Sequence, residues 1–159
     1  MAFDAFVQST IPPIQNRPDV YGEQWIMNEE DVVTARFQTL LVTASSIGID
    51  DVAALVGQYG GAAFPAHIDR PSYSVTAALG TIPAVGFMAM EVSARGDVAA
   101  LTTQYTEMKG KPLLLSSDAH YLHQIQECGP WLELPHCTPE ALIDTLSGKF
   151  TCAWGRELE

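Results

Sequence analysis

Apolar residues follow two patterns along this chain, stripes at helical spacing and short continuous runs. The stripes indicate helices, which we expect over residues 2–10, 49–59, 72–79, 97–108 and 138–146. The short runs indicate strands, which we expect at residues 25–27, 62–66, 86–92, 113–116 and 131–134. The run at residues 40–42 fits either element. Helices that alternate with short strands predict an α/β fold with a mostly parallel sheet or a barrel.

Turn and capping residues set the limits of these elements. Pro12-Pro13 stops the first helix, and the polar residues 15–24 after it predict a loop. Asp97 and Thr138 stand directly before helical stripes, where their side chains act as N-caps. Gly60-Gly61 ends the second helix. These signals are local, so they predict where helices begin and end but not which strands pair.

Side chains that bind metals lie at the ends of three expected strands. One apolar run is followed by two serines and then by Asp118-x-His120, another is followed by His67, and a third has Glu91 near its end. The carboxyl ends of parallel strands carry the site in sheets and barrels of this class. A carboxylate and an imidazole suit zinc, manganese and iron alike. The sequence therefore predicts part of a metal site.

Composition limits the classes of function that remain. The 159 residues are enough for one domain, and 47% of them are hydrophobic. The formal net charge of -11 argues against general binding to nucleic acids or to anionic membranes. No apolar run is long enough to span a bilayer, and no signal-peptide pattern is present.

The cysteines point to a reducing compartment. Cys128, Cys137 and Cys152 are odd in number and lack C-x-x-C spacing, which is typical of reduced thiols in a cytoplasmic protein. A zinc site made by Cys128, His136 and Cys137 is a weaker alternative, because an adjacent His-Cys pair has poor ligand geometry.

Three motifs occur in a fixed order: Pro65-Ala66-His67, Met90-Glu91-Val92 and Ser117-Asp118-Ala119-His120. This order resembles the polymerase and histidinol phosphatase (PHP) family of metal-dependent phosphoesterases. Residues 66–70 and 117–122 resemble a subgroup of stand-alone PHP proteins of clostridial type, and the similarity extends over most of the chain, into residues 135–139. The resemblance implies a (β/α)7-like distorted barrel that hydrolyses a phosphate ester with metal-activated hydroxide.

The chain departs from the family pattern in its first part. The family opens with a His-x-His pair and adds further histidines and a glutamate, whereas this chain has no histidine before His67. We therefore expect residues 1–157 to form a single partial PHP domain that lacks the N-terminal strands of the barrel. Leu158-Glu159 is typical of a cloning scar. A multi-metal cluster is expected only in the full-length parent, and this chain is expected to be inactive or weakly active.

The resemblance also implies roles for individual residues. Asp118 and His120 are catalytic residues and metal ligands, with His67 and Glu91 as further ligands. We expect Arg70 to contact the substrate phosphate, Ser72 and Ser74 to help to orient it, and His123 to act as an acid toward the leaving group. These roles are inferred from the proximity of the residues to the motifs in sequence. The substrate is a phosphorylated small molecule or a nucleotide.

Each residue also has an ordinary structural interpretation. His67 fits a hydrogen-bonded loop position, Asp118 fits a turn cap, Glu91 fits an ion pair with Arg95 or Arg70, and Arg70 fits a partner carboxylate such as that of Asp69. A non-catalytic PHP-like module for metal binding or interaction is thus the alternative function. In either case a partial barrel exposes strand edges, so we expect a homo-oligomer formed through them.

Overall fold

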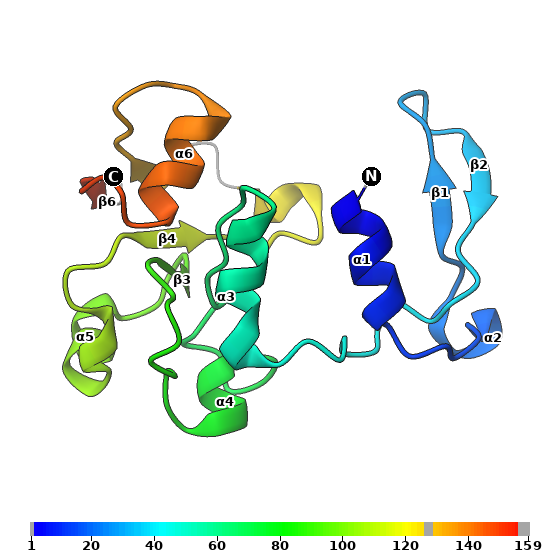
Figure 1. Cartoon of the computed structure of the whole chain (residues 1–159), viewed down its shortest axis with the longest axis horizontal. Helices are drawn as coiled ribbons and strands as arrows, with labels where there is room; N and C mark the ends of the chain where they lie inside the picture. Colours follow the sequence, from blue (N-terminus) through cyan, green and yellow to red (C-terminus); the bar gives the residue numbers. More distant parts are fainter. Residues whose placement is uncertain (1, 126–128, 156–159) are drawn as a thin grey trace. The chain divides into compact units, whose positions relative to one another are not determined.

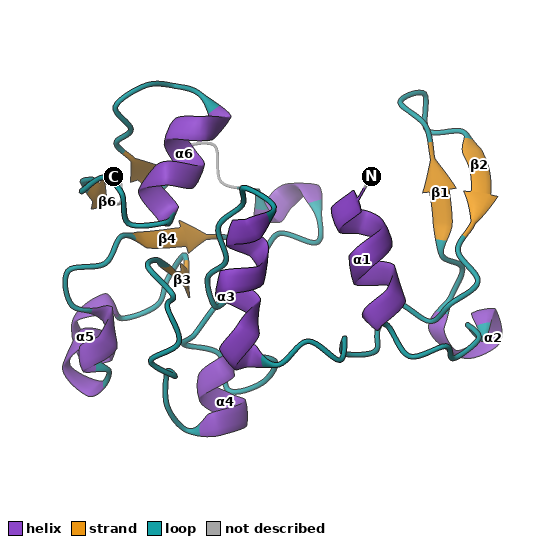
Figure 2. Ribbon diagram, in the orientation of Figure 1, coloured by secondary structure: helices purple, strands orange, loops and turns teal. Residues whose placement is uncertain are grey.

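The chain forms two compact units, an amino-terminal unit of residues 1–48 and a carboxyl-terminal unit of residues 49–159. The structure is a computed structural model that describes residues 2–125 and 129–155. Figures 1 and 2 show the elements of both units and the long loops between them. Within the described residues, none of the helices has the length and apolarity needed to cross a bilayer.

Residues 2–48, the described part of the amino-terminal unit, form two helices and one hairpin. Its elements are α1 (Ala2–Thr10), α2 (Pro18–Tyr21), β1 (Trp25–Met27) and β2 (Val33–Arg36). The predictions of a helix at residues 2–10 and a strand at 25–27 are confirmed. The predicted loop 15–24 contains the single turn α2, which begins at Pro18 because a proline ring is already set for the first helical position.

The antiparallel pairing of β1 with β2 was not predicted from the sequence. A turn at residues 28–32 connects the two strands. Asn28 stabilises this turn, because its Oδ1 accepts hydrogen bonds from the backbone N–H groups of Glu30 and Val32. Asp31 takes a left-handed conformation in this turn, with φ of 59°. Residues 40–42 form neither a strand nor a helix but follow the isolated bridge between Gln15 and Thr39 into a turn.

The carboxyl-terminal unit alternates helices with short strands. Its elements are α3 (Ile49–Gln58), α4 (Val75–Leu79), β3 (Met90–Ser93), α5 (Val98–Gln104), η1 (Thr106–Met108), β4 (Leu113–Ser116), η2 (Leu122–Gln124), β5 (Trp131–Leu132), α6 (Pro139–Leu146) and β6 (Trp154–Gly155). β3 and β4 pair in parallel, whereas β5 and β6 pair antiparallel. The mixed α/β class is confirmed. The sheets of the described residues have two strands each and are not mostly parallel, and none closes into a barrel.

The core of this unit lies between the parallel strands and the helix that connects them. Met90 and Val92 of β3 and Leu113 and Leu115 of β4 are buried at alternate positions, as expected for strands with one face inward. The predicted stripe packs against them, through Val98 and Leu101 of α5 and Tyr105 directly after it. Each fully buried side chain of this size contributes about 1.5–3 kcal/mol of hydrophobic stabilisation, so this cluster fixes the geometry of the strand ends.

Two predicted strands differ from the structure for identifiable reasons. Residues 62–66 form no regular strand, although they run beside β3: Glu91 N–H donates to Pro65 O at 3.0 Å and Ile68 N–H donates to Glu91 O at 3.0 Å. Pro65 has no N–H to donate, and the positive φ of 28° at His67 turns the backbone out of the ladder. The predicted strand 86–92 begins only at Met90, after Gly86 at φ of 80°.

Candidate functional site

Three chain segments end side by side at the carboxyl end of the parallel strand pair. β3 and β4 are in register from Met90↔Leu113 to Ser93↔Ser116, and the segment of residues 65–68 is hydrogen-bonded along the other edge of β3. This arrangement brings together the end of each predicted motif. The geometry therefore agrees with the expectation that the candidate residues lie at one edge of a parallel sheet.

Glu91 lies between two of these segments. Its Oε1 accepts a hydrogen bond from Ser116 Oγ at 2.8 Å and lies 3.7 Å from His67 Nδ1. Both side chains are mostly buried, with 18% of His67 and 16% of Glu91 exposed. His67 Nδ1 is buried and has no hydrogen-bond partner among the described residues, and such a group is costly to leave unmatched. Glu91 thus pairs with His67 and Ser116, rather than with Arg95 or Arg70 as one alternative had it.

Arg70 and Asp118 form a second charged pair beside the first. Arg70 Nη1 lies 2.6 Å from Asp118 Oδ2, so the two charged groups form a close ion pair. Asp118 has a φ of 49°, in the left-handed region that aspartate tolerates better than most residues. The alternative partner for Arg70, Asp69, instead accepts a hydrogen bond from Ser93 N–H at 2.8 Å through its Oδ1.

The hydrogen bond of His120 assigns its tautomer. Its Nδ1 lies 2.8 Å from the backbone oxygen of Asp118. A carbonyl oxygen only accepts, so Nδ1 is the donor, and in the neutral imidazole the lone pair then lies on Nε2. This is the arrangement in which a histidine is ready to bind a metal through Nε2. Gln124 fixes the same loop, because its Oε1 accepts from the N–H groups of His120 and Tyr121.

An open cleft of about 830 Å³ lies at this end of the strands. Its lining includes two guanidinium groups, two imidazoles and one carboxylate, from Arg70, Arg95, His120, His123 and Asp118. Two guanidinium groups thus lie close together here in a chain whose formal charge is -11. The His123 ring stacks on that of Tyr121, with centroids 5.8 Å apart.

The two serines predicted to orient a phosphate differ in position. Ser74 is buried and caps α4, accepting from Ala77 N–H at 3.0 Å and donating to Arg70 O at 2.7 Å. Its hydroxyl is therefore engaged in holding the backbone of Arg70 rather than facing the cleft. Ser72 is exposed and is not among the residues that line the cleft.

Sequence reasoning missed two residues that hold this end of the sheet together. Asp69 ties the Arg70 loop to the end of β3 through Ser93, and Gly96 lies directly against it. A Cβ at Gly96 would come within 2.4 Å of Val92 Cγ1 and 2.8 Å of Asp69 Oδ2. The sequence feature that indicates the contact between Gly96 and Asp69 is the glycine itself, because a glycine allows other atoms to approach the backbone closely.

The candidate metal ligands form pairs rather than one group. Among residues 2–125 and 129–155, no three His, Cys, Asp or Glu side chains lie close enough together to hold one metal ion. Two ligands of one tetrahedral zinc ion at about 2.1 Å stand about 3.4 Å apart, so the 3.7 Å between His67 and Glu91 fits two ligands of such an ion. His67 and Glu91 thus offer two ligands at a distance that suits one ion, without a third ligand nearby among the described residues.

The alternative zinc site falls partly outside the described residues, because Cys128 lies in the gap. His136 and Cys137 are exposed, and Cys137 and Cys152 are free thiols. Burial, and to a smaller extent the nearby Glu133, raises the pKa of the Cys152 thiol above its ordinary value. That thiol is therefore held in its neutral form, which is a poor metal ligand.

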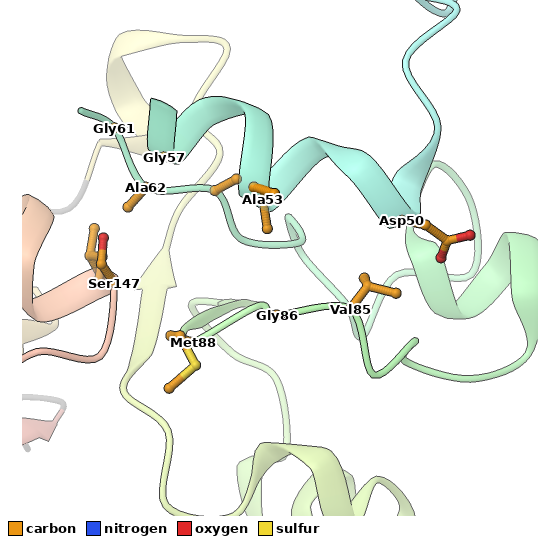
Figure 3. A pocket seen from close by; sticks show the side chains of 12 residues that line it. Asp50, Ala53, Gly57, Gly61, Ala62, Val85, Gly86, Met88 and Ser147 are labelled. Atoms are coloured by element: carbon orange, nitrogen blue, oxygen red, sulfur yellow. The ribbon is translucent and has the colours of Figure 1, made fainter. Parts of the chain in front are cut away.

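A second hollow of about 300 Å³ lies between α3 and residues 85–88 (Figure 3). Its lining is mostly small and apolar, including Ala53, Gly57 and Ala62, with Met88 at one side. Among the described residues that line it, Asp50 has the one ionisable side chain, and no imidazole or thiol is present. This hollow offers packing surface rather than reactive groups.

No family model, curated protein or solved structure matches the chain. The function of this chain is therefore inferred from its own residues, above all from the pairs His67–Glu91 and Arg70–Asp118.

Proposed function

We propose that this chain carries the carboxyl-terminal part of a metal-dependent phosphoesterase site of the PHP type, on a partial (β/α)7-like barrel. The observation that supports it is the meeting of two coupled pairs, His67–Glu91 and Arg70–Asp118, beside the ends of β3 and β4. Ionisable groups of both signs are concentrated there, at the place where α/β folds carry their sites.

In this proposal His67 and Glu91 bind one ion, and Asp118 with Nε2 of His120 offers ligands to another. The bound ions would supply hydroxide at neutral pH by lowering the pKa of water. Arg70 neutralises oxygens of the substrate phosphate with its planar guanidinium group. Because it now binds Asp118 at 2.6 Å, Arg70 and a cation compete for the same carboxylate. His123, on the wall of the cleft, donates a proton to the leaving group.

The same geometry explains why we expect weak or absent turnover. Catalytic zinc sites usually have three protein ligands, and within the described residues no group of three is present. The chain contains no histidine before His67 that could add one from its first part. The substrate we propose is a phosphorylated small molecule or a nucleotide, which the positive groups of the cleft can attract locally.

Metal content is the direct test. The purified chain is incubated with Zn²⁺ or Mn²⁺, desalted and subjected to elemental analysis beside the Asp118→Ala/His120→Ala variant. We expect bound metal in the wild type and less retained metal in the variant, because Asp118 and His120 would hold one of the two ions. His136→Ala is the matched control, because His136 is exposed and does not line the cleft. Equal metal in all three proteins would contradict the proposed ligands.

A non-catalytic module for metal binding or interaction is the second candidate, favoured by the absence of a three-ligand group in the described part of the chain. Hydrolysis of p-nitrophenyl phosphate with added Mn²⁺ separates the two candidates. Metal binding without turnover supports the module or an incomplete enzyme site, whereas robust turnover would overturn the expectation of weak activity. We also propose a cytoplasmic location, which suits the free thiols of Cys137 and Cys152.

A further inference from the structure

Strand β1 is exposed along its whole length. Trp25, Ile26 and Met27 are 55%, 44% and 46% exposed, and the strand carries no charged residue. Proteins usually protect such edges with charges, prolines or a covering segment. A two-stranded hairpin alone is also marginally stable in water. The strand therefore has both the surface and the energetic reason to pair.

The hydrogen-bonding pattern shows which groups face outward. Phe37 N–H donates to Gln24 O, and Asn28 N–H donates to Val32 O, so Gln24 and Asn28 bond inward to the hairpin. Bonding alternates along an antiparallel strand, which turns the backbone groups of Trp25 and Met27 to the outer edge. These residues offer two donors and two acceptors there.

The opposite edge of the hairpin is better protected. Beyond β2, residues 14–16 run along residues 38–40, with Asn16 N–H donating to Gln38 O and Leu40 N–H donating to Ile14 O. β2 itself ends in Arg36, which lies 3.6 Å from Glu23. Within the described residues, β1 is thus the edge that lacks both a covering segment and a charge.

Apolar side chains are exposed along the whole of β1 and on its partner strand. Trp25, Ile26, Met27 and Val33 are 55%, 44%, 46% and 43% exposed. Successive side chains of a strand point to opposite faces, so Trp25 and Met27 lie on one face of the hairpin and Ile26 lies on the other. A strand added at this edge would therefore meet apolar side chains on both faces.

We propose that β1 pairs antiparallel with β1 of a second copy of this chain, to form a continuous four-stranded sheet across a two-fold axis. Trp25 lies opposite Met27 of the second copy, and Ile26 lies opposite its own equivalent. Four backbone hydrogen bonds then form between the outward groups. A parallel pairing would bring the acidic turns at Glu29–Asp31 together, whereas the antiparallel one places them at opposite ends of the new strand pair.

A charge-swap experiment tests this pairing. Because Ile26 meets its own equivalent, Ile26→Lys and Ile26→Glu each place like charges opposite each other, which disfavours association strongly. Sedimentation velocity over a concentration series should give twice the chain mass of 17.2 kDa for the wild type. Each variant should be monomeric, with a dissociation constant raised at least about tenfold. An equimolar mixture of the two variants should recover the dimer.

Recovery in the mixture also shows that both variants still fold. Val42→Lys is the matched control, since Val42 is 75% exposed but lies outside the hairpin, and it should leave the dimer intact. A monomeric wild type, dimers that persist in both single variants, or a mixture that stays monomeric would each overturn the pairing. None of these results depends on the phosphoesterase proposal.

Discussion

Each of the two units is stabilised internally by a different kind of interaction. In the amino-terminal unit Leu40 is the one apolar side chain that is buried among the described residues, whereas the carboxyl-terminal unit buries a cluster that spans both parallel strands. The first unit relies on hydrogen bonds between the backbone and side chains such as Gln24, which donates, and Asn28, which accepts. The comparison teaches that the candidate site stands on the packed unit, while the hairpin has its apolar surface available for a partner.

The largest effect is expected from opening a cavity in the packed unit. Met90 is fully buried, and Met90→Ala should lower the free energy of unfolding of this unit by about 2–5 kcal/mol, from lost burial and the cavity left behind. Urea unfolding monitored by hydrogen exchange measures this change in free energy, and the amides of β3 and β4 should lose protection. Met88→Ala is the matched control, because Met88 is 41% exposed in the same segment. Equal costs for both methionines would contradict the assignment of the core.

A smaller effect is expected where the packed unit meets the candidate site. Gly96→Ala places a methyl group 2.4 Å from Val92 Cγ1 and 2.8 Å from Asp69 Oδ2, so a neighbour has to move. Overpacking of this kind costs about 1–3 kcal/mol, and it should also weaken metal binding by displacing the Arg70 loop. Thermal unfolding and calorimetric metal titration measure the two effects.

Gly57→Ala is the control for this change. Gly57 lies within α3, and a Cβ there would meet nothing within 4 Å. The substitution should stabilise the chain by up to about 1 kcal/mol, because alanine is the better helix former. A Gly96 variant as stable as the Gly57 variant would refute the close contact with Asp69.

The same contrast explains how much of the structure could be predicted from the sequence. Helix limits depend on neighbouring residues, and the predicted caps Asp97 and Thr138 do accept hydrogen bonds from Ala100 and Ala141 N–H. The partner of β1 was missed because residues 33–36 are interrupted by Thr34 and Arg36, so no continuous apolar run indicates a strand there. Residues 62–66 were predicted as a strand from their apolarity, but the backbone limits of Pro65 and His67 outweigh that pattern.

The candidate site was predictable in its residue types but not in its pairs. The order of His67, Glu91 and Asp118 along three strand ends was enough to expect them at one edge of a sheet. That Arg70 binds Asp118, and that Ser116 binds Glu91, depends on side chains from different segments. Such contacts across the sheet follow from register, which the sequence pattern alone does not determine.

The smallest effect should come from the hydrogen-bonded unit. Gln24 Nε2 donates to the backbone oxygens of Phe37 and Thr39, and its Oε1 accepts from Leu41 N–H at 2.9 Å. Gln24→Ala removes all three hydrogen bonds, each of which contributes a net stabilisation of about 1 kcal/mol. Because water can replace part of them, we expect the free energy of local unfolding to fall by about 1–2 kcal/mol. Hydrogen exchange at Leu41 should therefore speed up by roughly 5- to 30-fold.

Gln38→Ala separates this role from a general effect of losing a glutamine. Its amide makes a long bond of 3.5 Å to Arg36 O on the exposed surface, so exchange at Leu41 should stay near the wild-type rate. If the hairpin were stabilised mainly by packing, the two glutamine variants would behave alike. If the proposed pairing of β1 is also correct, raising the protein concentration should slow exchange at Trp25 and Met27 but not at Leu41, because only the outer edge is covered in the dimer.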